Sequence, residues 1–313
     1  MAEPNWEREV IERLAAEGLK EQRRARRWGI FFKLLTFAYL TVFLLALTDW
    51  KPDTEIAEGN GHTALIEVDG VIDADGNVSA ENITTSLQEA FKDQSTKGII
   101  LRINSPGGSP VQSGIIYDEI RRQRGLHPEV KVYAVVEDLC ASGGYYIASA
   151  ADEIYVDKAS LVGSIGVIMD QFGFVGTMDK LGVERRILTS GENKAFLDPF
   201  APMKPEHAAH AKQMLAEIHQ QFIDVVKKGR GSRLKESPEL FSGMFWTGAK
   251  SIELGLADHF GNVESVARDV IKAENIVDYT QKESLAERFG KRFGTTMANA
   301  LAETYLRQAV SLR

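Results

Sequence analysis

The chain has 313 residues, of which 44% are hydrophobic and 26% are charged, and its formal net charge is -7. This is a globular composition, with room for one large domain or two modest ones. The acidic balance argues against nucleic acid as the main partner, because phosphate contacts need a basic surface. Cys140 is the one cysteine, so an internal disulfide is excluded.

The N-terminal segment predicts a membrane anchor. Residues 1–27 form a charged tail that ends in EQRRARR, and the apolar run WGIFFKLLTFAYLTVFLLALTDW follows at residues 28–50. This run is long enough to cross a bilayer at about 1.5 Å per residue. Arginines before it and acids after it predict a cytoplasmic N-terminus with the remaining chain outside. A cleaved signal peptide and a buried core helix are the alternatives; the long apolar core and the poor cleavage site in ALTDW disfavour the first.

The remaining chain predicts one α/β domain. Residues 51–62 are polar and are expected to be a linker, residues 63–275 the domain, and residues 276–313 a helical extension. Apolar runs alternate with helical patterns, which is typical of a parallel sheet covered by helices. The expected strands are TALIEVDG, GIILRINS, KVYAVVED, EIYVD, GSIGVIM and VERRILTS. Helices are expected in ENITTSLQEAFKDQ and SGIIYDEIRRQR, around residues 145–151, and over residues 204–230, 262–275 and 283–311.

Two unusual turns carry the candidate chemistry. Ser142 follows the strand KVYAVVED and precedes two glycines, where its hydroxyl would be presented and the Gly143 amide could donate to an oxyanion. The turn SPGG ends another buried strand, and the carboxyl ends of parallel strands are where open α/β sheets bind ligands. The amides of Gly108 and Gly143 could together make an oxyanion hole. The alternatives are that Ser142 is only a helix N-cap and that SPGG is an ordinary turn.

A serine nucleophile needs a base. No histidine lies between residues 128 and 206, and EHAAH lacks the spacing of the zinc motif HExxH. Lys194 is the candidate instead, although a free lysine has a pKa near 10.4 and must be shifted by about 3 units to be neutral. Ser164 could hold the uncharged amine by a hydrogen bond. The alternative is that Lys194 is an exposed loop lysine. Cys140, two residues before Ser142, is a weak rival nucleophile.

Taken together, these motifs resemble the S49 family of serine peptidases, in the short, single-domain form of the bacterial signal peptide peptidases. The resemblance covers roughly residues 60–275. It rests on INSPGGS, ASGGYYIASAADEIY, SLVGSIGVIM, VVKKGRG and FWTGAKSIELGLAD in this order. One departure is Ser109, where the family often has a third glycine.

The resemblance implies the residue roles, the fold and the assembly. It makes Ser142 the nucleophile, Lys194 the general base and Ser164 the hydroxyl that orients the lysine, with Gly108 and Gly143 as the oxyanion hole. It implies the fold shared by Clp-type peptidases and crotonases, with no cofactor and no metal. It also implies an octameric ring or dome whose active centres are shared between neighbours. The expected location is the bacterial inner membrane, with the catalytic domain on the periplasmic side.

The expected activity is endopeptidase cleavage of apolar, extended chains such as signal peptide remnants in or at the membrane. Four alternatives stay open. A related S49 protease would act on membrane or exported proteins, and an inactive scaffold would only bind peptides. A Clp-like peptidase would need a histidine soon after the serine, and crotonase chemistry has no use for a Ser–Lys pair.

Overall fold

The computed structural model describes residues 6–47, 61–235 and 237–281, and the chain divides into two compact units. The larger unit, residues 57–282, contains all the motifs that point to chemistry. The smaller unit combines residues 1–56 with residues 283–313, and its described part is the helix α1 (Trp6–Leu47). The helix expected at residues 283–311 and most of the expected linker lie outside the described residues.

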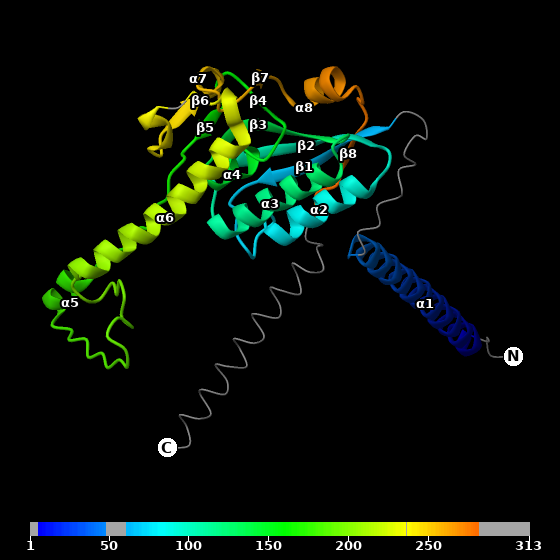
Figure 1. Ribbon diagram of the computed structural model, residues 1–313. Helices are drawn as coiled ribbons and strands as arrows, with labels where there is room; N and C mark the ends of the chain where they lie inside the picture. The colour runs from blue at the N-terminus through cyan, green and yellow to red at the C-terminus, as the bar shows by residue number, and fades with distance from the viewer. Residues whose placement is uncertain (1–5, 48–60, 236, 282–313) are drawn as a thin grey trace, which may run out of the picture. The chain divides into compact units, whose positions relative to one another are not determined.

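An eight-stranded sheet forms the centre of the larger unit (Figure 1). Its main path runs β6-β5-β3-β2-β1-β8, with β4 beside β3 and β7 beside β4. All pairs are parallel except β5 with β6. The predicted α/β class with a mostly parallel sheet is confirmed. The strands are β1 (His62–Asp69), β2 (Thr96–Ser105), β3 (Lys131–Ala141), β4 (Glu153–Val156), β5 (Leu161–Gly163), β6 (Phe245–Thr247), β7 (His259–Phe260) and β8 (Ile276–Asp278).

Helices cover both faces of this sheet because its strands carry apolar side chains on both. Alternate residues of β1 and β2, such as Ile66 and Leu101, pack in the larger core with α2 (Ala80–Lys92), α3 (Pro110–Leu126), α4 (Gly143–Ala148) and α6 (Pro205–Arg230). Their neighbours Leu65 and Ile100 pack in a smaller core with Val266. Short elements complete the unit: α5 (Val175–Leu181), η1 (Gly231–Arg233), η2 (Pro238–Phe241), α7 (Gly248–Glu253), α8 (Val263–Ser265) and η3 (Val266–Ile271).

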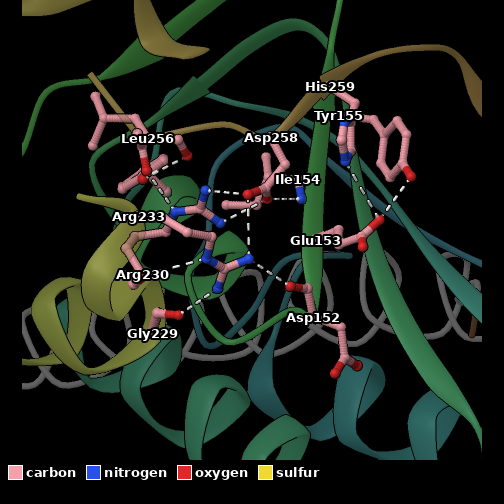
Figure 2. Close-up of polar contacts among 12 residues, drawn as sticks. Asp152, Glu153, Ile154, Tyr155, Gly229, Arg230, Arg233, Leu256, Asp258 and His259 are labelled. Atoms are coloured by element: carbon pink, nitrogen blue, oxygen red, sulfur yellow. Dashed lines mark hydrogen bonds and ion pairs between the residues drawn. The ribbon is translucent and has the colours of Figure 1, made fainter. Parts of the chain in front are cut away.

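A buried ion pair fastens the C-terminal end of α6 to the sheet (Figure 2). The Arg230 guanidinium, 1% exposed, donates to both carboxylate oxygens of Asp258 at 2.7 and 2.8 Å and to the Gly255 carbonyl. Asp258 also accepts from the backbone amide of Ile154 in β4. Burial alone would raise the pKa of Asp258, but the hydrogen bonds and charge of Arg230 hold it below its usual value. The pair therefore stays ionised at neutral pH.

Four details differ from the expectation. The expected strand GSIGVIM, residues 163–169, does not form, because β5 ends at Gly163 and residues 164–169 enter neither a helix nor a strand. The run VERRILTS, residues 183–190, forms no strand: its side chains are exposed, and none of its residues pairs with a strand of the described sheet. The last expected helix of the domain is a short α8 followed by a π-helix, which ends at Lys272 in the left-handed conformation. The sheet extends past residue 275, since β8 pairs with β1.

The expected membrane anchor falls on α1. Among the residues that the structure describes, no helix is both long and apolar enough to cross a membrane. The side chains of residues 44–47 and all of residues 48–50 lie outside the described part, so the span predicted for residues 28–50 is described only in part.

Candidate active site

The corner that carries Ser142 is held in an unusual conformation. Ser142 lies between the end of β3 and the start of α4 with φ 51° and ψ -120°, a region that L residues rarely adopt. Its amide donates to the Gly163 carbonyl at 2.9 Å, and its carbonyl accepts from Tyr146. Its hydroxyl makes no capping hydrogen bond, so Ser142 is not a side-chain N-cap. Non-glycine residues in such conformations cluster at functional sites.

The SPGG turn lies directly against this corner and has no room for side chains. A Cβ on Gly107 would lie 2.7 Å from the Gly143 nitrogen and from Ser142 Cβ. A Cβ on Gly108 would lie 2.1 Å from the Ile72 carbonyl oxygen, and its φ of 152° also disfavours other residues. The glycines therefore allow the turn to approach the serine backbone closely.

Gly108 and Gly143 lie next to each other and line the same pocket. The position of a Cβ on Gly143 would lie 3.3 Å from the Gly108 nitrogen. Neither amide donates to another group among the described residues. Unpaired backbone N–H groups near a nucleophile are the donors from which oxyanion holes are built, so these two amides are the candidates for that role.

Ser164 belongs to the same site. It follows β5 with φ 50°, and its amide donates to the Met244 carbonyl at 2.8 Å. Ser142 and Ser164 are joined through Gly163, whose carbonyl accepts from the Ser142 amide. Together with Gly108 and Gly143, both serines line a pocket of about 550 Å³. Four of the five predicted site residues are therefore brought together.

Lys194 lies away from this pocket in the folded chain. It is exposed and does not line this pocket. Its neighbour Asn193 contacts His207 in the first turns of α6 at 3.2 Å, whereas the pocket is lined by Ile218 and Phe222, further along the helix. At about 1.5 Å per residue, the position of His207 along the axis of α6 lies roughly 16–22 Å from the positions of Ile218 and Phe222. In Figure 1, the segment around α5 lies at the end of α6 remote from α4.

The rest of the pocket is largely apolar. Tyr146 of α4 and Phe222 of α6 are in ring contact at 5.1 Å, and Ile218, Val167 and Ile168 line the wall beside them. Burial raises the pKa of the Tyr146 phenol, so it stays uncharged. No sequence motif marks these lining residues. The helical spacing of residues 218, 221 and 222 marks one face of α6, but it does not indicate what that face covers.

Cys140 is unsuited to be the nucleophile. Its side chain is fully buried in β3, and burial raises the pKa of the thiol far above its usual value. The thiolate, which is the reactive form, is therefore disfavoured. Among the residues that the structure describes, no group of histidine, cysteine and acidic side chains could hold a metal ion.

Comparison with known proteins places this site in a family. The sequence profile of peptidase family S49 matches residues 125–277, which include Ser142, Ser164 and Lys194. The putative protease slr0021 of Synechocystis is 31% identical over 201 residues, which cover 64% of this chain and 70% of that protein. The putative signal peptide peptidase SppA of Enterococcus faecium is 30% identical over 200 residues, or 64% and 58% of the two chains.

A further relative carries a different name. The Na(+)/H(+) antiporter NhaA of Brucella abortus is 50% identical over 182 residues, 58% of this chain but only 25% of that protein. This chain thus spans a quarter of that relative, and the transport function in its name stays with that protein. The profile match and the relatives named as proteases agree with the geometry around Ser142. The chain belongs to peptidase family S49.

Proposed function

We propose that this protein is a membrane-anchored endopeptidase that cleaves apolar, extended peptides, including signal peptide remnants, with Ser142 as nucleophile and Lys194 as general base. The observation that carries the proposal is the strained Ser142 corner, where two unpaired glycine amides lie in a pocket with an apolar wall. The lining by Ile218, Phe222 and Val167 favours apolar side chains of the substrate.

The proposed reaction uses these groups together with Lys194 of a neighbouring subunit. The neutral Lys194 amine, held by the Ser164 hydroxyl, takes the Ser142 proton as the serine oxygen attacks a peptide carbonyl. The Gly108 and Gly143 amides stabilise the oxyanion; the loss of one such donor typically costs about 3 kcal/mol in the transition state. The protonated lysine gives its proton to the leaving amine, and water then hydrolyses the acyl-enzyme. The proposed roles require no cofactor.

Lys194 reaches Ser142 of a neighbouring subunit in this proposal. Within one chain, the segment of Lys194 lies against the first turns of α6, whereas the Ser142 pocket lies against the middle of that helix. In this proposal one subunit therefore supplies the serine and the next supplies the lysine. The segment that carries Lys194, residues 168–204, is called the arm below. It exposes large apolar side chains, among them Ile168, Phe172, Leu181 and Leu188. Exposed apolar surface of this kind is typical of subunit interfaces. We therefore propose a closed ring or dome, with eight subunits as the family resemblance suggests.

The anchor and the location are part of the same proposal. Apolar side chains from Trp28 to Phe43 are exposed all around α1, and a helix that is apolar on every side needs an apolar environment. We propose that this segment holds the enzyme in the bacterial inner membrane, with the peptidase unit on the periplasmic side. The unit would share the fold of Clp-type peptidases and crotonases.

The proposal is tested by peptidase assays on the purified full chain in detergent, with apolar fluorogenic peptides across a pH series. We expect activity in the native chain and none with Ser142→Ala or Lys194→Ala. Activity that survives Lys194→Ala would eliminate the proposed base. Folded native protein that cleaves none of the peptides, but cleaves a denatured membrane protein, would favour the related protease; binding without cleavage would favour the scaffold.

A further inference from the structure

The short turn of residues 163–166 links the nucleophile to the hydroxyl that orients the base. Gly163 accepts the hydrogen bond from the Ser142 amide, and Ser164 comes next in the chain. Both Gly163, with φ 114°, and Ser164, with φ 50°, have conformations that side chains disfavour. After Ser164 the chain leaves the sheet without entering a helix or strand. Such a turn keeps its shape only if neighbouring groups hold it.

One side of the turn is held by the chain before β6. The Ser164 amide donates to the Met244 carbonyl at 2.8 Å, and the Gly166 backbone lies against Gly243, since a Cβ on Gly166 would be 3.1 Å from Gly243 Cα. These contacts restrain the Ser164 amide and the Gly166 backbone. The Ile165 carbonyl, which lies between them in the chain, needs a separate partner.

His219 of α6 is that partner. Its Nε2 lies 3.1 Å from the Ile165 carbonyl oxygen. A carbonyl only accepts hydrogen bonds, so Nε2 must carry the proton and donate. The Ile165 side chain is fully buried in the core, which fixes the other end of the same residue. His219 is half-buried, and its neighbours Ile218, Gln221 and Phe222 line the pocket.

We propose that His219 is a positioning residue: by holding the Ile165 carbonyl it keeps the Ser164 hydroxyl aimed at the amine of the catalytic lysine. This inference rests on the proposed roles of Ser164 and Lys194. His219 itself is absent from the pocket lining and touches no reacting atom. Without its hydrogen bond, the left-handed Ser164 relaxes toward an ordinary conformation, and its hydroxyl leaves the place where the amine must be held.

The test compares two substitutions of matched length in the full chain. His219→Met removes the donor and keeps side-chain length, whereas His219→Gln keeps an amide donor at the same reach. We expect His219→Met to lower kcat about tenfold or more, the size of effect that an ångström-scale misplacement produces, with KM nearly unchanged. His219→Gln is expected to restore most of the lost kcat. Gln220→Met, at the exposed neighbouring position, serves as the control and should leave kcat and KM unchanged.

A double substitution separates positioning from general packing. If His219 acts through Ser164, His219→Met in a Ser164→Ala background should cause no further loss of kcat. The inference would be overturned if the double variant lost kcat by the product of the two single losses. It would also be overturned if His219→Gln had a kcat as low as that of His219→Met. A Ser164→Ala variant with native kcat would overturn it too, while loss of activity in Ser142→Ala would leave the peptidase function standing. Activity that survives Ser142→Ala would instead overturn the proposed function itself.

Discussion

At the scale of single residues, the site depends on places where a side chain is absent. Gly108 and Gly143 have no side chain that would cover their amides beside Ser142. The close contacts that an added Cβ would make show that neither position has room for a side chain. At Gly143 that Cβ would lie 2.4 Å from Ser113 Oγ and 3.3 Å from the Gly108 nitrogen. Its φ is ordinary, so strain there comes from crowding alone. Stability and activity can therefore be separated at this position.

We predict that Gly143→Ala lowers both stability and activity, because overpacking a filled site typically costs about 1–3 kcal/mol. Adding Ser113→Ala removes the oxygen that the new methyl group meets. The double variant should regain stability in urea unfolding but stay inactive, since the methyl group still covers the Gly108 amide. Ser113→Ala alone is the control. Recovery of activity in the double variant would mean that this amide is not used.

A second residue-scale prediction concerns His62, where the chain enters the sheet. The imidazole is fully buried, with Nε2 3.0 Å from the Tyr279 hydroxyl, and Tyr279 in turn donates to Asp93. Burial lowers the pKa of His62 below its ordinary 6.5, and the charge of Asp93 only partly opposes this. Because the folded pKa lies below the unfolded value, the unfolded chain binds the proton more readily.

The stability that His62 contributes should thus be complete above pH 6.5 and be lost as the pH falls from there through the folded pKa. Urea unfolding between pH 7.5 and 5 measures this. We expect the free energy of unfolding to fall more steeply in the native chain than in His62→Gln, which cannot titrate. Equal slopes would show that the folded chain protonates His62 as easily as the unfolded one.

At the scale of elements, α6 runs from the segment that carries Lys194 to the Ser142 pocket. Its middle supplies Ile218, Gln221 and Phe222 to the pocket lining, and the chain before its first turn carries Lys194. Its C-terminal end is fastened to the sheet by Arg230 and Asp258 (Figure 2). The ion pair thus holds the C-terminal end of a helix whose Phe222 and Val226 are packed in the larger core.

Arg230→Met should destabilise the protein by about 3 kcal/mol, because the buried Asp258 carboxylate loses its bidentate partner and keeps only Arg233 at 3.2 Å and the Ile154 amide. Chemical unfolding followed by circular dichroism measures the change. Lys228→Met, at an exposed position of the same turn, is the matched control and should stay within about 0.5 kcal/mol of the native chain. A loss below 1 kcal/mol for Arg230→Met would mean that water reaches the carboxylate.

At the scale of the whole molecule, the arm is the feature that a single chain leaves unexplained. Its apolar side chains are exposed, with Leu188 at 99%, and residues 183–190 lack a partner strand in the described sheet. Lys194 lies in this segment, away from Ser142. Both observations are accounted for if the arm packs on a neighbouring subunit and delivers the lysine there.

Mixing two inactive proteins tests this arrangement. If the dyad forms between subunits, Ser142→Ala and Lys194→Ala chains that are dissociated, mixed and reassembled should regain activity. In a randomly mixed ring with head-to-tail contacts, about a quarter of the sites would combine an intact serine with an intact lysine. Each variant taken alone through the same treatment is the control. A mixture that stays inactive, although mixed assemblies form, would place both residues of the dyad in one subunit.

The sequence by itself determined the α/β class, most of the long strands and helices, and the placement of Gly108, Gly143 and Ser164 beside Ser142. These features depend on local patterns: buried strands are continuous apolar runs, and tight turns demand glycine. The helix expected at residues 204–230 was found as Pro205–Arg230, and the expected corner was found between β3 and α4.

The tertiary structure alone decided the remaining features. Whether VERRILTS is a strand depends on a neighbouring strand, which no local pattern can supply, and the described sheet has none there. The contact of His219 with the Ile165 carbonyl joins residues 54 positions apart in the chain. The ion pair of Arg230 with Asp258 joins residues 28 positions apart. The separation of Lys194 from Ser142 follows from the length and direction of α6. Long-range packing sets each of these distances, and sequence spacing does not encode them.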